Sequence, residues 1–169
     1  NTYYLFYERH ITPLSSVIEV IYSNDLIHWS EPRRVLKPSL EWEGTLTKTV
    51  GNPCVIRVEE KYRLYYSANA VFLRDCLFNE PKYISFAESD EGMLGPYKKH
   101  GKPIIGPSDF KYRNLGAGSI KIFLSEDDEW IAFNNGIYVD KKGKSRSAIL
   151  VIVSRDGVNW MDVCRRPII

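Results

Sequence analysis

Three acidic residues lie in polar loop segments where a carboxylate can transfer a proton or act as a nucleophile: Glu43, Asp75 and Asp109. Glu43 follows Trp42, an aromatic residue that would shield the carboxylate from water and raise its pKa, as a general acid requires. A solvated loop carboxylate is the alternative for Glu43. Asp75 follows Arg74, which favours a structural ion pair, and Asp109 stands where an aspartate commonly caps a turn. The sequence therefore offers three candidate catalytic carboxylates, each with a structural alternative.

Seven further residues in or beside such segments are candidates for binding a polar ligand. They are Arg9, His10, Trp42, Asn52, Asn69, Arg113 and Asn134. Arginine and asparagine side chains hydrogen-bond hydroxyl groups, and histidine also titrates near neutral pH. A structural histidine is the alternative for His10, and the asparagines could instead satisfy backbone groups of nearby strands.

Metal and cofactor chemistry finds little support in the sequence. The three cysteines, Cys54, Cys76 and Cys164, are far apart, and the three histidines form no closely spaced pairs with them. A structural zinc site requires such pairs, so we predict no metal and no cofactor. One disulfide is compatible with the count, but three reduced thiols fit better. With no signal peptide in the sequence, they favour a cytoplasmic location.

The composition indicates which elements must position these residues. The chain has 169 residues, enough for one domain, with the hydrophobic content (44%) and charged content (26%) of a soluble globular protein. Aromatic residues make up 13%, and their abundance favours strands over helices. A net charge of +2 argues against nucleic acid as a partner. The most apolar stretch, Ser147–Ser154, is too short to cross a membrane, so we predict no membrane partner.

A turn motif recurs along the chain. Ser23–Trp29 and Ser154–Trp160 share the pattern S-x-D-x-x-x-W, and a looser copy spans Ser89–Tyr97. The copies lie about 65 residues apart, and each full copy follows an alternating apolar strand. The aspartates can accept hydrogen bonds from turn amides, and the tryptophans can fold back to fill the gap between neighbouring sheets.

A pair of strands precedes two of these turns and is also repeated. The pairs are Asn52–Arg57 with Lys61–Tyr66 and Gly118–Phe123 with Glu129–Phe133, joined by the acidic turns Val58–Glu60 and Ser125–Asp128. Tyr3–Tyr7 matches the second strand of the pair only. Repeated four-stranded meanders of this kind are typical of a β-propeller. We therefore predict an all-β chain of antiparallel four-stranded blades, in units of about 1–38, 50–105 and 116–169 within a single partial domain, 1–169. A β-sandwich with a coincidental pair of turns is the alternative.

These motifs resemble those of a known group of enzymes. N-P-x-V-I-x-x-x-x-K-Y-x-L-Y-Y-S at Asn52–Ser67, the S-x-D-x-x-x-W turns, and S-D-x-x-x-x-x-G-P-Y at Ser89–Tyr97 are similar to the blades of five-bladed glycoside hydrolase propellers. This clan includes the arabinanases and xylosidases of family 43, the invertases and inulinases of family 32, and the levansucrases. The segment Gly116–Ser119 is also similar to a late blade of family 43 and of the mannoside phosphorylases. The resemblance implies a carbohydrate ligand and cleavage of glycosidic bonds by paired carboxylates.

The blade length conflicts with a closed ring. At about 65 residues per blade the chain holds about 2.6 blades, whereas propellers close with at least four. We therefore expect further blades before Asn1, after Ile169, or both; self-association through the open blade edges is the alternative.

The resemblance also implies where the site lies. It places the substrate at one end of the blade axis, formed here by segments 8–15, 39–52, 68–81, 107–118 and 134–146. At the strand starts where relatives carry acidic residues, this chain has Gly51-Asn52-Pro53 and Gly116-Ala117-Gly118 instead. A catalytic protein would then need one carboxylate from a missing blade and one from a loop, for which Glu43 is the best candidate. A non-catalytic module that binds glycan or protein is the alternative. Hydrolysis, phosphorolysis and an axial calcium ion are all compatible with the resemblance.

Overall fold

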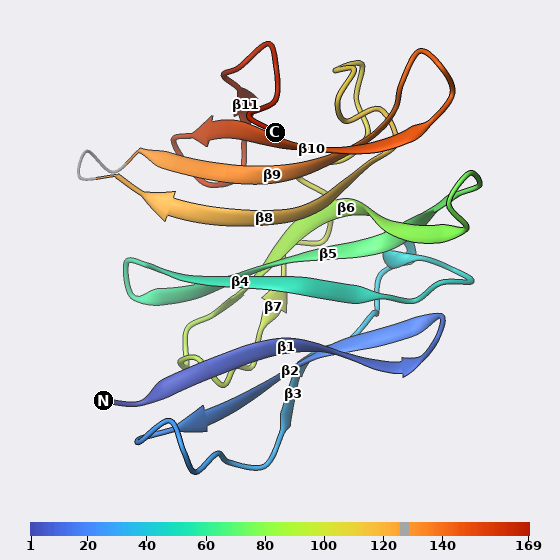
Figure 1. Cartoon of the computed structure of the whole chain (residues 1–169). Helices are drawn as coiled ribbons and strands as arrows, with labels where there is room; N and C mark the ends of the chain where they lie inside the picture. The colour runs from blue at the N-terminus through green and yellow to red at the C-terminus, as the bar shows by residue number, and fades with distance from the viewer. Residues whose placement is uncertain (126–128) are drawn as a thin grey trace.

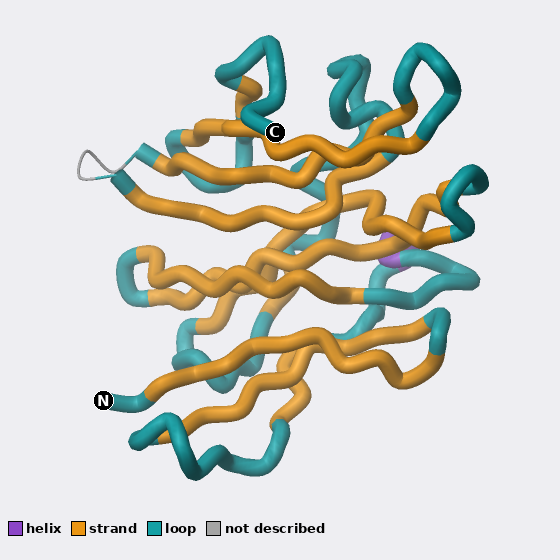
Figure 2. The backbone as a smooth tube through the Cα atoms, in the orientation of Figure 1, coloured by secondary structure: helices purple, strands orange, loops and turns teal. Residues whose placement is uncertain are grey.

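The computed structural model describes residues 1–125 and 129–169, which form three antiparallel sheets lying side by side (Figure 1). Residues 126–128 of the predicted acidic turn lie outside the described residues. Figure 2 shows that strands and their connecting loops account for nearly all of the described chain. One short helical turn, η1 (Glu41–Glu43), precedes the second sheet.

Each sheet is a meander in which consecutive strands pair. The first contains β1 (Tyr3–Thr12), β2 (Ser15–Ser23) and β3 (Arg33–Leu36). The second contains β4 (Val50–Val58), β5 (Lys61–Leu73), β6 (Phe78–Ser89) and β7 (Lys98–Lys99). The third contains β8 (Gly116–Leu124), β9 (Trp130–Val139), β10 (Ser145–Ser154) and β11 (Met161–Asp162). The predicted all-β class with four-stranded antiparallel sheets is confirmed. β1 is equivalent to β5 and β9, so residues 1–36 supply no counterpart of β4 and β8.

The core consists of two apolar layers, one on each face of the second sheet. Because side chains alternate along a strand, Leu64 and Tyr66 of β5 face the first sheet and Tyr65 faces the third. All three are fully buried. The burial of each such side chain contributes about 1.5–3 kcal/mol to the free energy of unfolding. The sheets are therefore stable only as a stack, in which each covers its neighbour.

The repeated turns have the predicted hydrogen bonds. The Oδ1 atom of Asp25 accepts from the amides of Ile27 and His28 at 2.9 and 2.8 Å. The Oδ1 atom of Asp156 accepts in the same way from two turn amides at 2.8 and 2.7 Å. Gly157, next to Asp156, has φ +67°, and a side chain there would overlap the ring of Trp130.

The two tryptophans of the turns differ in burial. Trp160 packs edge-on against Tyr65 and Trp130, with ring centroids 6.5 and 6.4 Å away, and so fills the gap between the second and third sheets. Trp29 remains 37% exposed. The reason is that Trp160 packs against the preceding sheet, and the described chain holds no sheet before the first. The gap-filling prediction is thus correct for Trp160 and wrong for Trp29 within these residues.

Candidate functional site

The predicted site segments gather at one end of the three sheets. Figure 1 shows the β1–β2, β5–β6 and β9–β10 connections together on its right side, with the segment that leads into β4. This follows from the meander, because alternate connections of antiparallel strands emerge at the same end. The loops at this end therefore come from all three sheets.

A cavity of about 280 Å³ opens at this end between the first and second sheets. It is lined by Glu8, His10, Pro13, Thr47, Thr49, Asn52, Asn69, Ala70, Phe78, Asn79, Glu80 and Pro81. The lining combines two carboxylates, an imidazole, amides, hydroxyls and an aromatic ring. Such a mixture of donors, acceptors and one apolar plate suits a small, uncharged ligand with many hydroxyl groups.

One wall of the cavity comes from β1. Glu8 and His10 are two residues apart and therefore share a face of the strand, with His10 Nε2 lying 3.5 Å from Glu8 Oε1. Gly51 of β4 lies beneath them, and any side chain at that position would overlap the Glu8 carboxylate. Arg9 points to the other face, where its guanidinium binds Glu19 at 3.3 Å. Only one of the adjacent residues Arg9 and His10 could enter the cavity, and it is His10.

The two predicted asparagines lie in the cavity wall and also hold its backbone. Both adopt left-handed φ values, 49° for Asn52 and 62° for Asn69. Asn52 Nδ2 donates to Ser67 Oγ at 2.8 Å and to the carbonyl of Gly118 at 3.2 Å. Asn69 Nδ2 donates to the carbonyl of Trp42 at 2.9 Å. Their NH₂ groups thus serve the structure, as the alternative interpretation held, while both residues still line the cavity.

Because Asn52 acts as a donor, an aspartate at this position should be destabilising. The Asn52→Asp variant would place a carboxylate against the Gly118 carbonyl and lose both hydrogen bonds, which is expected to lower the free energy of unfolding by about 1–3 kcal/mol at neutral pH. Urea denaturation measures this loss. The introduced carboxyl can donate only when protonated, so its pKa should rise in the folded state and the lost stability should return as the pH falls.

Asn79→Asp provides the matched control. Asn79 also lines the cavity but is exposed. Its replacement should change the free energy of unfolding by less than about 0.5 kcal/mol. Equal effects of the two substitutions would show that the contact of Asn52 with Gly118 is not important for stability.

Glu80 was not among the predicted site residues, yet it lies in the cavity wall at the start of β6. Its carboxylate is half-buried, and no protein donor in the described chain lies within hydrogen-bond distance. Burial raises the pKa of Glu80. It also borders a smaller cavity whose other lining residues are Leu73, Cys76, Ile137, Ser145, Arg146 and Ser147. A carboxyl group in such surroundings is more easily kept protonated than one in water.

Glu43 occupies a different environment from the one predicted. It is fully buried and accepts hydrogen bonds from the amides of Ser39 and Leu40 at 2.6 and 2.8 Å and from Tyr66 Oη at 2.9 Å. Lys99 Nζ lies 2.6 Å from Glu43 Oε1. Both interpretations of Glu43 therefore need correction, since a carboxylate saturated by internal donors is neither solvated nor placed to reach a ligand.

Trp42 also has a structural role. Its ring stacks on Tyr66 at 6.1 Å, and its Nε1 donates to the carbonyl of Gly101 at 3.0 Å. The packing of Trp42 closes the gap between η1 and the second sheet. It is absent from the cavity lining, so its predicted ligand contact is not supported.

The remaining predicted residues lie outside the cavity. Asp75 accepts hydrogen bonds from the amide and hydroxyl of Ser145, which lower its pKa, rather than pairing with Arg74. Asp109 is exposed in the loop before β8. Arg113 is buried, and its guanidinium donates two hydrogen bonds to the Asp162 carboxylate, at 2.9 and 2.7 Å.

Asn134 is buried behind Arg113 and is likewise structural. Its Oδ1 accepts from Arg113 Nη1 at 3.1 Å, and its Nδ2 donates to the carbonyl of Ser119 at 2.8 Å. Of the ten predicted site residues, the cavity therefore brings together His10, Asn52 and Asn69. Glu8 was not among the predicted site residues, although it begins the predicted site segment 8–15 and shares a strand face with His10.

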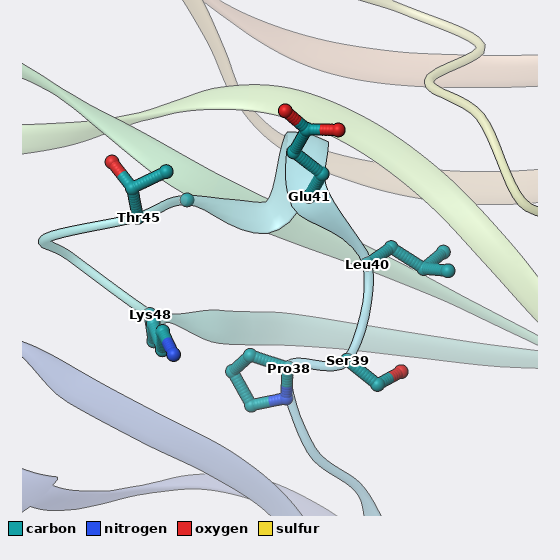
Figure 3. Close-up of a pocket in the computed structure, with 7 residues that line it drawn as sticks. Pro38, Ser39, Leu40, Glu41, Thr45 and Lys48 are labelled. Atoms are coloured by element: carbon teal, nitrogen blue, oxygen red, sulfur yellow. The ribbon is translucent and has the colours of Figure 1, made fainter.

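A second cavity at the same end, of about 350 Å³, lies in the segment before β4 (Figure 3). Its lining consists of Pro38, Ser39, Leu40, Glu41, Gly44, Thr45 and Lys48. Figure 3 shows Glu41 and Lys48 pointing away from each other. With a single carboxylate and no aromatic ring, this cavity is the weaker candidate.

Two further observations bear on metal and membrane partners. In residues 1–125 and 129–169, no group of three or more His, Cys, Asp or Glu side chains is arranged to hold a metal ion. None of the helical structure in that part of the chain is long and apolar enough to span a membrane.

No family model and no curated protein matches the sequence. Among solved structures, a thermostable family-43 glycoside hydrolase superposes with a TM-score of 0.73 and 26% identity over 98% of this chain and 55% of that protein. An endo-1,4-beta-xylanase from Bacteroides thetaiotaomicron gives a TM-score of 0.73 with 21% identity, over 98% of this chain and 56% of the xylanase.

A third similar structure is sucrose-6-phosphate hydrolase from Lactobacillus gasseri, with a TM-score of 0.70 and 19% identity over 95% of this chain and 31% of that enzyme. The chain thus spans about half the length of the first two structures and less of the third. The likeness to propeller enzymes excludes the β-sandwich alternative. In its fold and in the order of its sheets, this chain is therefore similar to the propeller glycoside hydrolases, among them an enzyme of family 43.

Proposed function

We propose that this chain forms part of a carbohydrate-active propeller and that a sugar binds in the 280 Å³ cavity between the first and second sheets. The main support for this proposal is the position and lining of the cavity. It opens at the loop end of a glycoside hydrolase-like propeller and is lined by carboxylates, amides and an imidazole. Similar structures include a family-43 glycoside hydrolase, a xylanase and a sucrose-6-phosphate hydrolase. Their names support carbohydrate as the ligand class.

The chemistry of the lining fits a sugar. Each sugar hydroxyl both donates and accepts a hydrogen bond, so it pairs with carboxylates such as Glu8 and with amide groups such as that of Asn79. Phe78, which is 59% exposed, offers an apolar plate on which the C–H face of a sugar ring can stack.

Binding to a panel of mono- and oligosaccharides tests this proposal. Titration calorimetry with the chain should detect at least one sugar ligand, and Phe78→Ala should weaken its affinity at least tenfold. Phe123→Ala is the control, because Phe123 is 54% exposed but lies on β8 of the third sheet and outside the cavity lining. Failure of every sugar to bind, or equal losses in the two variants, would contradict the proposed site.

A non-catalytic glycan-binding module is the second candidate function. It is favoured by Asn52, whose amide is committed to Ser67 and Gly118, and by the absence of a carboxylate at the starts of β4 and β8. Sugar binding without cleavage of any aryl glycoside would support this function over a hydrolytic one.

A further inference from the structure

We propose that the sugar ligand is an acidic oligosaccharide, with an uncharged unit in the 280 Å³ cavity and an anionic group of the adjoining unit bound by Arg146. The inference rests on the proposed function, since it needs a sugar in that cavity, and it adds the class of sugar. The anionic group is a carboxylate, a sulfate or a phosphate, all of which present paired oxygen acceptors to a guanidinium.

The smaller cavity, of about 180 Å³, adjoins the larger one at Glu80, which lines both. Its lining comes from the β5–β6 hairpin of the second sheet and the β9–β10 hairpin of the third, whose connections lie at the same end in Figure 1. The amide of Ser145 donates to Asp75 Oδ2 at 2.9 Å and so joins the two hairpins. A chain of sugar units that leaves the larger cavity over Glu80 therefore enters the smaller one.

The connections of these two hairpins carry an excess of positive charge. Their carboxylates, Asp75 and Asp140, are already held by backbone amides of the β9–β10 hairpin, at 2.9 Å for Asp75 and at 2.8 and 3.0 Å for Asp140. The cationic side chains are all exposed, and they are Arg74, Lys141, Lys142, Lys144 and Arg146. Exposed cations gathered beside a cavity attract anionic ligands to it.

Arg146 is the cation placed to bind the anionic group directly. It lines the smaller cavity, and its side chain is 56% exposed. Its Nε donates to Asp140 Oδ2 at 3.2 Å, which orients the guanidinium. In the part of the chain that the structure describes, neither Nη1 nor Nη2 of Arg146 donates a hydrogen bond, so this pair of donors is available to two oxygens of one anionic group.

The distribution of charge separates the two ends of the ligand. The larger cavity is lined by the carboxylates of Glu8 and Glu80 and would repel an anion, so it suits the uncharged unit. Glu80 also lines the smaller cavity, where a charged carboxylate would oppose the anionic group. Burial raises the pKa of Glu80, which favours its neutral form and reduces this opposition.

Titration calorimetry with matched disaccharides tests the inference. The probes carry one uronic acid, one sulfate or one phosphate on the second unit, and each is paired with its uncharged counterpart, which for the uronic acid is the methyl ester. At least one acidic probe should bind about tenfold more tightly than its counterpart at low salt. Because exposed charges are screened, this preference should shrink as the ionic strength rises. The three probes also distinguish which anionic group the site accepts.

Arg146→Gln should abolish most of the preference for the acidic probe, because it removes the charge and the paired donors. Arg155→Gln is the matched control and should keep the preference. Arg155 follows the other end of β10 and is also exposed. It lies about 30 Å from Arg146 along an extended strand at ~3.3 Å per residue, well beyond the screening length of about 8 Å at physiological salt.

Equal affinities for acidic and uncharged probes would overturn the anionic subsite and leave the proposed function intact. A preference that survives Arg146→Gln, or that falls equally in Arg155→Gln, would overturn the assignment to Arg146. Failure of every probe to bind, whether acidic or uncharged, would instead overturn the proposed function.

Discussion

Replacing Glu43 with Gln is expected to lower the free energy of unfolding by about 3–5 kcal/mol, because it removes one partner of a buried ion pair. Lys99 is only 12% exposed, and its ammonium group lies 2.6 Å from Glu43 Oε1. Burial lowers the pKa of Lys99 and the contact with Glu43 raises it, so the carboxylate supports the charged form of the lysine. A glutamine amide would also turn a donor toward groups that are themselves donors, the amides of Ser39 and Leu40.

A double-mutant cycle isolates this interaction. Removing both charges in Glu43→Gln/Lys99→Met should recover part of the stability lost in Glu43→Gln alone, since no buried charge then lacks a partner. Glu41→Gln is the control, because Glu41 is exposed on the same helical turn. Urea denaturation of the unaltered chain, of Glu43→Gln, of Lys99→Met and of the double variant gives the four values of the cycle. A loss below about 1 kcal/mol in Glu43→Gln would mean that water reaches Lys99 readily.

The second large effect is expected at the junction of the second and third sheets. Tyr65→Ala should lower the free energy of unfolding by about 3–5 kcal/mol, as large-to-small substitutions of buried aromatic residues do. The Tyr65 ring is fully buried, with the rings of Phe86 and Trp130 at 5.8 and 6.4 Å. Its hydroxyl donates to the carbonyl of Gly157 at 2.7 Å, across to the third sheet.

The variant Tyr65→Phe separates packing from hydrogen bonding. It keeps the ring and loses two hydrogen bonds, the one that the hydroxyl donates to Gly157 and the one that it accepts from Arg63 Nη1 at 3.2 Å. The Gly157 carbonyl keeps a hydrogen bond from Trp160 Nε1, so the free energy of unfolding should fall by about 1–3 kcal/mol, the usual contribution of two hydrogen bonds. Hydrogen exchange should show that β9 and β10 lose protection in Tyr65→Ala before β1 and β2 do. Equal costs for the two variants, or uniform loss of protection, would show that the sheets do not depend on this contact as proposed.

Much of the fold could be predicted from local patterns. The aspartate of the repeated turn accepts hydrogen bonds from amides only two and three residues ahead. A short sequence motif is therefore enough to predict the turn. The strands can also be predicted from the sequence. Alternating apolar residues indicate a strand buried on one face, and a continuous run such as Leu64-Tyr65-Tyr66 indicates a strand buried on both faces. These signals depend on neighbours within a single meander.

The candidate site was less predictable, because it depends on contacts between residues far apart in sequence. Glu43 stands in a polar loop beside an aromatic residue, as a catalytic acid would, yet Lys99 and Tyr66 from other elements enclose it. Glu80 lies within the predicted site segment 68–81 but was not among the predicted site residues. Its burial and its lack of a donor result from the packing of β6 at the cavity.

The sequence by itself determined the architecture: three antiparallel meanders, the repeated turns, and the end of the sheets at which the polar loops meet. Only the tertiary structure decided which polar residues share a cavity, bringing Glu8 and Glu80 together and enclosing Glu43 and Arg113 in internal bonds. The reason is physical. Secondary structure follows from periodicities that a short segment contains, whereas the exposure and partners of a side chain depend on which sheet packs against it.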